Sequence, residues 1–231
     1  GDKWFTGVTC TDGAGSPRAD VYADCTNDDM KQIRLVEQQN AARVGKYSAM
    51  LQLGYPSSAL KDTTNRFPED DLEKILKATQ PDVVYTHNPA DKHATHVAVA
   101  LSALRAIRCL PADERPSAVY GCETWRNLDW LPDDCKVVLD VGERHNLAAA
   151  LMGIYDSQIT GGKRYDLATF GRWQANATFL ESHGTDQFEA ASYAVDLSPL
   201  VRDDKLDPLG YIDDLVQQFR KRVQDQIRAV A

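Results

Sequence analysis

The chain has 231 residues, a hydrophobic fraction of 43% and a formal net charge of −8. These values are ordinary for a globular protein and exclude a wholly disordered or fibrous chain. The acidic balance argues against a general nucleic-acid binder, because neutralising phosphates requires a basic surface. No apolar run is long enough to span a bilayer. The length favours a single domain over residues 1–231.

The five cysteines are odd in number and widely spaced, and none forms a C-x-x-C pair. This pattern argues against a zinc ribbon or a thioredoxin motif. It favours free thiols in a reducing cytoplasm, so we expect a cytoplasmic protein with Cys10 and Cys109 in its core.

The order of apolar runs and turn residues predicts strands that alternate with helices. In chain order we expect a strand at 4–10, a helix at 27–47, a strand at 49–53, a helix at 68–78, a strand at 83–87, a helix at 92–108, strands at 118–122 and 137–141, and helices at 143–159, 165–182 and 208–229. This alternation is typical of an α/β fold, a Rossmann-like three-layer sandwich with a mostly parallel sheet. The last helix is amphipathic and either packs on the domain or supports a homo-oligomer.

Two loops that follow predicted strands are candidates for a binding site, because ligands of such sheets bind at the carboxyl ends of strands. They cover residues 11–18 and 87–96. The first loop lacks the glycine spacing of phosphate-binding loops. We interpret it either as a plain turn or as the rim of an active site, in which Asp12 lies near the metal pocket.

Three of the histidines fall inside ten residues, at His87, His93 and His96. His93 and His96 are three positions apart, so they share a face in the first turn of a helix. Imidazole is a common zinc ligand, and the amino end of a helix disfavours its protonated form. The spacing by itself leaves two interpretations open, a metal site and an ordinary polar pair. Asp91 is expected to cap this helix.

This segment resembles the second motif of the PIG-L/LmbE-like family of zinc-dependent N-deacetylases, which has the form H-x-D-H after a strand. Here the motif reads His93-Ala94-Thr95-His96. Other features of the family follow in the same order along the chain: the turn Thr11-Asp12-Gly13, the helix pattern Arg34-x-x-Glu37-x-x-x-Ala41, the strand end Leu53-Gly54-Tyr55-Pro56 and the pair Ser157-Gln158. The resemblance therefore implies an LmbE-like fold over most of the chain.

The resemblance implies a metal-dependent hydrolase that removes an N-acetyl group from an amino sugar, such as an N-acetylglucosamine conjugate. His96 would be a zinc ligand, and His93 would stabilise the oxyanion and give a proton to the leaving amine. Arg34 would bind the substrate, and Asp12 is a second predicted substrate contact. The expected partner is a small N-acetylated sugar, and Trp125 is a candidate to stack on its ring.

Two departures from the family pattern matter for activity. Thr95 stands where the family has Asp, and a hydroxyl supplies no negative charge to orient a histidine. The family's first motif, His-Pro-Asp-Asp, supplies the other zinc ligands and the general base, and the sequence lacks it. His183-Gly184-Thr185-Asp186 repeats its His-to-Asp spacing, and we interpret it as a helix end capped at Gly184 rather than as a replacement metal site.

We therefore expect an amino-terminally truncated member of the family that lacks its first strand and binds zinc weakly on its own. The alternative is a non-catalytic carbohydrate- or nucleotide-binding module that kept the fold and lost the metal.

Overall fold

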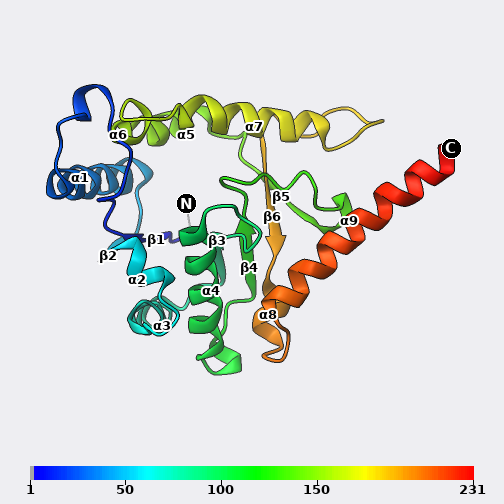
Figure 1. The fold of residues 1–231 in the computed structure, drawn as a ribbon, viewed down its shortest axis with the longest axis horizontal. Helices are drawn as coiled ribbons and strands as arrows, with labels where there is room; N and C mark the ends of the chain where they lie inside the picture. Colours follow the sequence, from blue (N-terminus) through cyan, green and yellow to red (C-terminus); the bar gives the residue numbers. More distant parts are fainter. Residues whose placement is uncertain (1–2) are drawn as a thin grey trace. The chain divides into compact units, whose positions relative to one another are not determined.

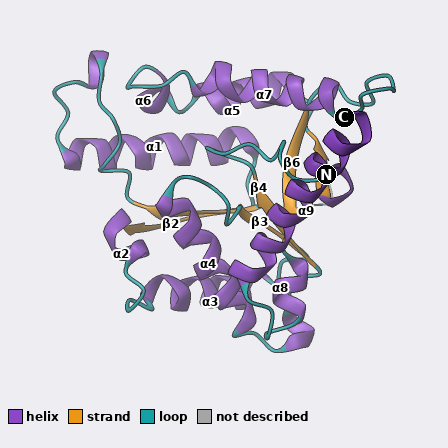
Figure 2. Cartoon of the chain, turned by 45° about the vertical axis from the view of Figure 1, so that its right-hand side comes forward, coloured by secondary structure: helices purple, strands orange, loops and turns teal. Residues whose placement is uncertain are grey.

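The structure is a computed structural model and describes residues 3–231 (Figures 1 and 2). Its strands are β1 (Thr6–Thr11), β2 (Ala49–Tyr55), β3 (Val83–His87), β4 (Ala118–Cys122), β5 (Lys136–Asp140) and β6 (Ala191–Asp196). Its α-helices are α1 (Asn27–Gly45), α2 (Ser57–Lys61), α3 (Phe67–Thr79), α4 (Ala94–Arg108), α5 (His145–Gly153), α6 (Asp156–Ile159), α7 (Tyr165–Phe179), α8 (Ser198–Arg202) and α9 (Pro208–Val230).

The chain divides into two compact units, and each unit is built from two stretches of sequence. The first unit comprises Gly1–Pro68 and Asp140–Ala190, and the second comprises Glu69–Leu139 and Ala191–Ala231. The single domain expected from the length stays a prediction.

The first unit contains a two-stranded parallel sheet, in which Thr6 of β1 lies opposite Ala49 of β2. α1 begins where the sequence indicates, because the Thr26 side chain accepts a hydrogen bond from the Asp29 N–H while the Asp29 carboxylate accepts one from the Thr26 N–H. α1 contacts β2, α5 and α6, and α7 contacts α5 and α6. Helices from both stretches of this unit therefore pack together.

The second unit contains a four-stranded sheet with the order β3-β4-β6-β5. β3 and β4 are parallel, so their last residues, His87 and Cys122, lie opposite each other. β6 runs antiparallel to β4. α4 packs on β3 and α8 packs on β4. The core of this unit contains fully buried apolar side chains, among them Leu104, Ile107, Val119, Leu128, Tyr193, Val195, Leu197 and Leu200.

The α/β class and the order of the expected strands are confirmed, but the second unit is only partly parallel. The sequence does not predict β6, which is the antiparallel strand, and its alanines are a residue type depleted in strands. The helix expected at 143–159 is two helices, because the chain leaves the α5 helix at Ile154 and Tyr155. The short helices α2 and α8 were not predicted either.

Free thiols and the lack of a membrane span are two expectations from composition. All five cysteines are unpaired. Cys10 is buried in β1 as expected, but Cys109 is exposed because it stands at the end of α4, so its placement in the core is wrong.

Within residues 3–231, no helix combines the length and the apolar character needed to cross a bilayer.

Candidate functional site

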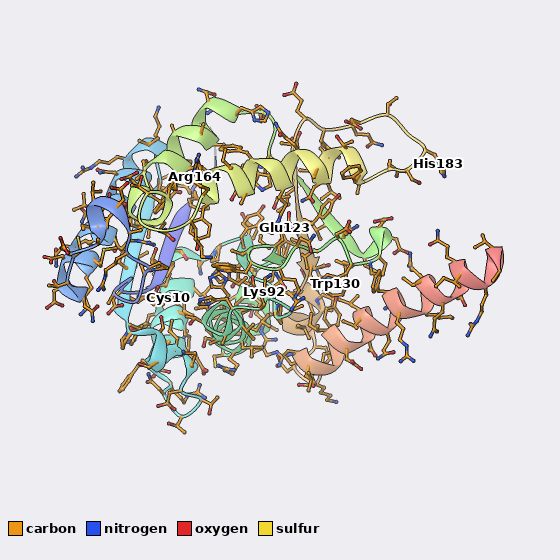
Figure 3. All side chains as sticks on the ribbon, turned by 45° about the horizontal axis from the view of Figure 1, so that its top comes forward. Cys10, Lys92, Glu123, Trp130, Arg164 and His183 are labelled. Atoms are coloured by element: carbon orange, nitrogen blue, oxygen red, sulfur yellow. The ribbon has the colours of Figure 1, made fainter. Side chains whose placement is uncertain are left out.

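The loop after β3 is anchored to the end of β4. Asn88, which follows His87, is fully buried. Both its side-chain amide and its backbone N–H donate hydrogen bonds to the Cys122 carbonyl, at 2.9 and 3.3 Å. Because the strands are parallel, this contact joins two loops at one edge of the sheet, 88–93 and 123–127. In Figure 3, Lys92 and Glu123 mark these two loops.

Asp91, whose side chain is fully buried, connects the same two loops through its carboxylate. It accepts hydrogen bonds from the backbone N–H of His93 at 2.9 Å and from that of Trp125 at 3.1 Å. The expected capping role is wrong in detail, because α4 begins at Ala94 and the capping position is occupied by His93. Asp91 instead holds the turn that leads into the helix.

The three clustered histidines come together above this carboxylate. The rings of His87 and His96 are stacked, with centroids 3.8 Å apart and planes at 5°. The His93 ring centroid lies 4.6 Å from that of His96, which confirms that these two side chains share one side of the helix start. The Asp91 Oδ2 atom lies 3.5 Å from Nδ1 of His96. The result is one compact cluster of three imidazoles and a carboxylate.

The protonation states of this cluster follow from burial and from neighbouring charge. Burial lowers the pKa of His87 to about 4, and repulsion by His96 acts in the same direction. Burial also lowers the pKa of His96, against the opposing attraction of Asp91. Burial favours protonation of Asp91, but the hydrogen bonds from His93 and Trp125 outweigh it and lower the pKa of the carboxyl. At neutral pH the cluster therefore holds neutral His87 and His96 beside an ionised carboxylate.

The second loop adds an aromatic side chain next to His93. The Trp125 ring lies 6.1 Å from the His93 ring, with an angle of 19° between their planes. Its neighbour Glu123 points into the protein instead, where its buried carboxylate accepts hydrogen bonds from the backbone N–H groups of Tyr193 and Leu128. Glu123 is thus a structural anchor of this loop, whereas Trp125 lies beside the histidine cluster.

His96 has chemistry that suits a metal ligand. Its imidazole is neutral, and its Nδ1 atom is buried with no hydrogen-bond partner and faces Asp91. A carboxylate behind one ring nitrogen typically orients the other nitrogen for metal binding. However, within residues 3–231 no three His, Cys, Asp or Glu side chains are placed so that they could hold a metal ion together. His96 fits zinc as a single donor, and the described side chains do not complete a ligand set.

Arg34 and Asp12, the predicted substrate contacts, lie in the first unit, whereas the histidines belong to the second. Arg34 is four-fifths buried on α1, and its Nε atom lies 3.5 Å from Glu37. The turn that holds Asp12 comes close to this side chain, because a Cβ atom at Gly13 would lie 2.7 Å from Cγ of Arg34. Asp12 itself accepts a hydrogen bond from the Ala14 N–H and lies 3.8 Å from Lys31. The first unit therefore brings the two predicted substrate contacts into one neighbourhood.

The segment His183-Gly184-Thr185-Asp186, which has the His-to-Asp spacing of the family's first motif, does not cap a helix. α7 ends at Phe179 with Leu180 as its capping residue, so the expected cap at Gly184 is wrong. His183 is exposed (Figure 3), and Asp186 accepts a hydrogen bond from the Thr178 hydroxyl. A replacement metal site here has no support, since within residues 3–231 no three His, Cys, Asp or Glu side chains are placed to hold a metal ion.

Sequence reasoning missed two members of the cluster. His87 was noticed as one of three neighbouring histidines but was given no role, and Asp91 was considered only as a cap. The available signal was their position, because both flank a loop at the end of a strand. Their contacts with Thr124 and Trp125 arise from the parallel pairing of β3 with β4. This pairing joins segments that are far apart in the sequence, so a short stretch of sequence does not reveal it.

Comparison with known proteins agrees with the resemblance. Residues 2–107 match the family described as PIG-L: GlcNAc-PI de-N-acetylase, and this stretch contains the whole histidine cluster. No curated protein sequence gives a significant match to the chain.

Solved structures share the fold at low sequence identity. The N,N'-diacetylchitobiose deacetylase from Pyrococcus horikoshii is 19% identical, with a TM-score of 0.59, over 82% of this chain and 72% of that chain. The deacetylase of the A40926 pseudoaglycone is 15% identical, with a TM-score of 0.59, over 84% and 85%. The 4-carboxy-2-hydroxymuconate hydratase from Pseudomonas putida is 15% identical, with a TM-score of 0.59, over 84% of both chains.

These neighbours show that the chain has the same α/β fold as they do. They also show that this fold serves more than one reaction, because the hydratase is not a deacetylase. The case for a PIG-L activity must therefore rest on the residues of the site.

Proposed function

We propose that this PIG-L chain is a zinc-dependent N-deacetylase that hydrolyses the acetamide of an amino sugar or its conjugate. The observation that carries the proposal is the cluster at the carboxyl ends of β3 and β4, where His93 and His96 lie side by side above the buried carboxylate of Asp91. The family match over residues 2–107 supports this reaction, and two structural neighbours with the same fold are deacetylases.

His96 is proposed as a zinc ligand. A metal ligand must be a neutral imidazole, and burial keeps His96 in that form at neutral pH. Asp91 faces its Nδ1 atom at 3.5 Å, which is the position from which a carboxylate orients a metal-binding imidazole. When bound, zinc would lower the pKa of a water molecule and polarise the acetamide carbonyl. We assign no further ligand and no general base among the side chains of residues 3–231.

His93 is proposed as the general acid that protonates the leaving amine. It stands at the capping position of α4, is exposed, and lies next to His96, so it is accessible to a bound acetamide. Trp125 lies beside it with its ring nearly parallel to the imidazole, which suits stacking on the apolar face of a sugar. The roles of Arg34 and Asp12 as substrate contacts stay predictions.

Acetate release from N-acetylglucosamine conjugates tests the reaction. The assay uses the full natural protein with zinc, and compares it with His93→Ala and with His183→Ala, an exposed histidine away from the cluster. Loss of the general acid is expected to lower kcat by about 10²-fold or more, while His183→Ala leaves it unchanged. A zinc-loaded protein that releases no acetate, or equal rates in both variants, would overturn the proposal.

Metal analysis tests the ligand separately. The full natural protein is expected to bind zinc, and His96→Ala is expected to lose it while His183→Ala retains it. Circular dichroism of each variant establishes that the fold is intact. Zinc binding that is the same with and without the His96 imidazole would contradict its assignment as a ligand.

A non-catalytic sugar- or nucleotide-binding module is the second candidate, and one observation favours it. Thr95, which stands where the family has Asp, is buried and carries no charge. A protein that binds N-acetylglucosamine without binding zinc and without releasing acetate would identify such a module.

A further inference from the structure

The C-terminal helix α9 extends beyond the unit to which it belongs. It begins at Pro208, where the Asp207 carboxylate accepts a hydrogen bond from the Gly210 N–H. Its first turns are held in place, since Leu215 is buried and the Tyr211 hydroxyl donates to the Asp196 carbonyl at 2.7 Å. From Val216 onward every residue is exposed. In Figure 1 the red half of the helix runs away from α8.

One face of α9 packs against the rest of the second unit. The residues that do so repeat at helical spacing: Tyr211, Leu215, Gln218 and Arg222. Arg222 forms a bidentate ion pair with Asp134, at 2.7 and 2.8 Å, and Gln218 accepts a hydrogen bond from the Cys135 thiol. This face fixes the direction of the helix.

A second face of α9 is apolar and uncovered. Val216, Phe219 and Val223 are 40%, 39% and 41% exposed, and Ile227 and Val230 are 59% and 86% exposed. Each of the first three follows a packing residue by one position, so this stripe is turned by about 100° from the packing face. Such a stripe is not needed to hold the helix against its own unit.

The spacing of the stripe is that of a coiled coil, with Gln226 as the one polar residue at a core position between residues 209 and 230. Leu209, Val216, Val223 and Val230 recur every seven residues. Each seven-residue repeat of a coiled coil has a second core position three residues after the first. Ile212 and Phe219 occupy it, three residues after Leu209 and Val216. A seven-residue apolar repeat is the pattern by which helices pack side by side through an apolar seam. The stripe therefore suits packing against a helix that carries a similar stripe.

We propose that α9 pairs with α9 of a second copy of this chain, antiparallel and around a two-fold axis. This proposal is independent of the proposed enzymatic function. A second copy presents an identical stripe, and a two-fold interface uses the same patch on both chains. The paired length is a few helical turns, so we expect weak association that depends on protein concentration.

The charges beside the stripe specify the antiparallel direction. Asp213 and Arg220 are seven residues apart on the same edge of the stripe, have opposite sign, and form no ion pair within the described part of the chain. In an antiparallel pair this edge faces itself, so Asp213 of each copy would meet Arg220 of the other. A parallel pair would instead place Arg220 opposite Leu215, which carries no charge to pair with it.

Sedimentation velocity of the full chain over a wide range of concentration tests this pairing. The wild type is expected to shift from monomer to dimer as concentration rises. Val223→Asp is expected to weaken the dimer about tenfold or more, because it would bury an unpaired charge. Gln224→Asp adds the same charge one position away, off the stripe, and is expected to retain the dimer. Thermal unfolding establishes that both variants are folded.

Charge reversal tests the direction. Asp213→Arg and Arg220→Asp are each expected to weaken the dimer, and the double variant is expected to restore it. A wild type that stays monomeric at all concentrations would overturn the proposal and leave the stripe to another partner or to the remainder of its own chain. Equal effects of Val223→Asp and Gln224→Asp would overturn it as well. Failure of the double variant to restore the dimer would overturn the antiparallel arrangement.

Discussion

Glu37 on α1 accepts two hydrogen bonds from Ser157 on α6, one from its backbone N–H and one from its hydroxyl, each at 2.7 Å. Ser157 is fully buried and Glu37 is 7% exposed. The two residues are 120 positions apart, so their contact fastens the two stretches of the first unit to each other. The same carboxylate lies 3.5 Å from Arg34 and so positions that side chain as well.

Ser157→Ala is expected to lower the free energy of unfolding by about 1–3 kcal/mol, because a buried oxygen of the Glu37 carboxylate would lose the hydrogen bond from the Ser157 hydroxyl. Chemical denaturation measures the change. Ser58→Ala, at an exposed position of α2, is the matched control and is expected to change stability by less than about 0.5 kcal/mol. Equal effects of the two substitutions would show that the hydroxyl of Ser157 contributes nothing.

Asp91→Ala is expected to destabilise the second unit and to disorder the histidine cluster. The substitution leaves the backbone N–H groups of His93 and Trp125 without their acceptor, at a cost of about 1–3 kcal/mol. Asp91→Asn keeps one acceptor oxygen and is expected to lose less. Asp113→Ala, at an exposed site, is the control. Amide hydrogen exchange at Trp125 should accelerate in Asp91→Ala, and unchanged exchange would contradict this role.

Local patterns were sufficient to predict the start of α1 and the proximity of His93 to His96. The acidic first turn after Thr26 forms the expected cap, and a spacing of three residues brings the two rings to 4.6 Å. Both features depend on residues within one helical turn. The end of β3 at His87 was predicted correctly for the same reason. The start of the loop that carries the histidines was therefore correct as well.

Contacts between distant segments could not be predicted in this way. The buried environment of Asp91 exists because β4 lies beside β3 and brings Trp125 to its carboxylate. The family pattern contains both Glu37 and Ser157, yet the pattern alone does not say that they bind each other. β6 escaped prediction because it is buried against neighbours from far along the chain, and its own residues have weak strand preference.

Cys10 is expected to resist alkylation in the folded protein. Burial raises the pKa of its thiol to about 11, so very little reactive thiolate is present at about pH 8. Cys109 is exposed and is expected to react under the same conditions. Mass spectrometry of iodoacetamide-treated peptides measures both sites, and both should react in denaturant. Rapid labelling of Cys10 without denaturant would contradict its position in the core.

Gly13→Ala is expected to destabilise the first unit and to displace Arg34. Gly13 has a φ of +76°, which costs an L-residue about 1 kcal/mol or more, and the new Cβ would lie 2.7 Å from Cγ of Arg34. Gly15→Ala is the matched control two positions away, because its new Cβ meets no atom within 4 Å and its φ is not positive. Because alanine restricts the unfolded chain more than glycine does, Gly15→Ala should leave the free energy of unfolding unchanged or raise it slightly. If the denaturation curves of the two variants coincide, the turn at Gly13 accommodates the added methyl group. In that case the turn does not hold the Arg34 side chain in place.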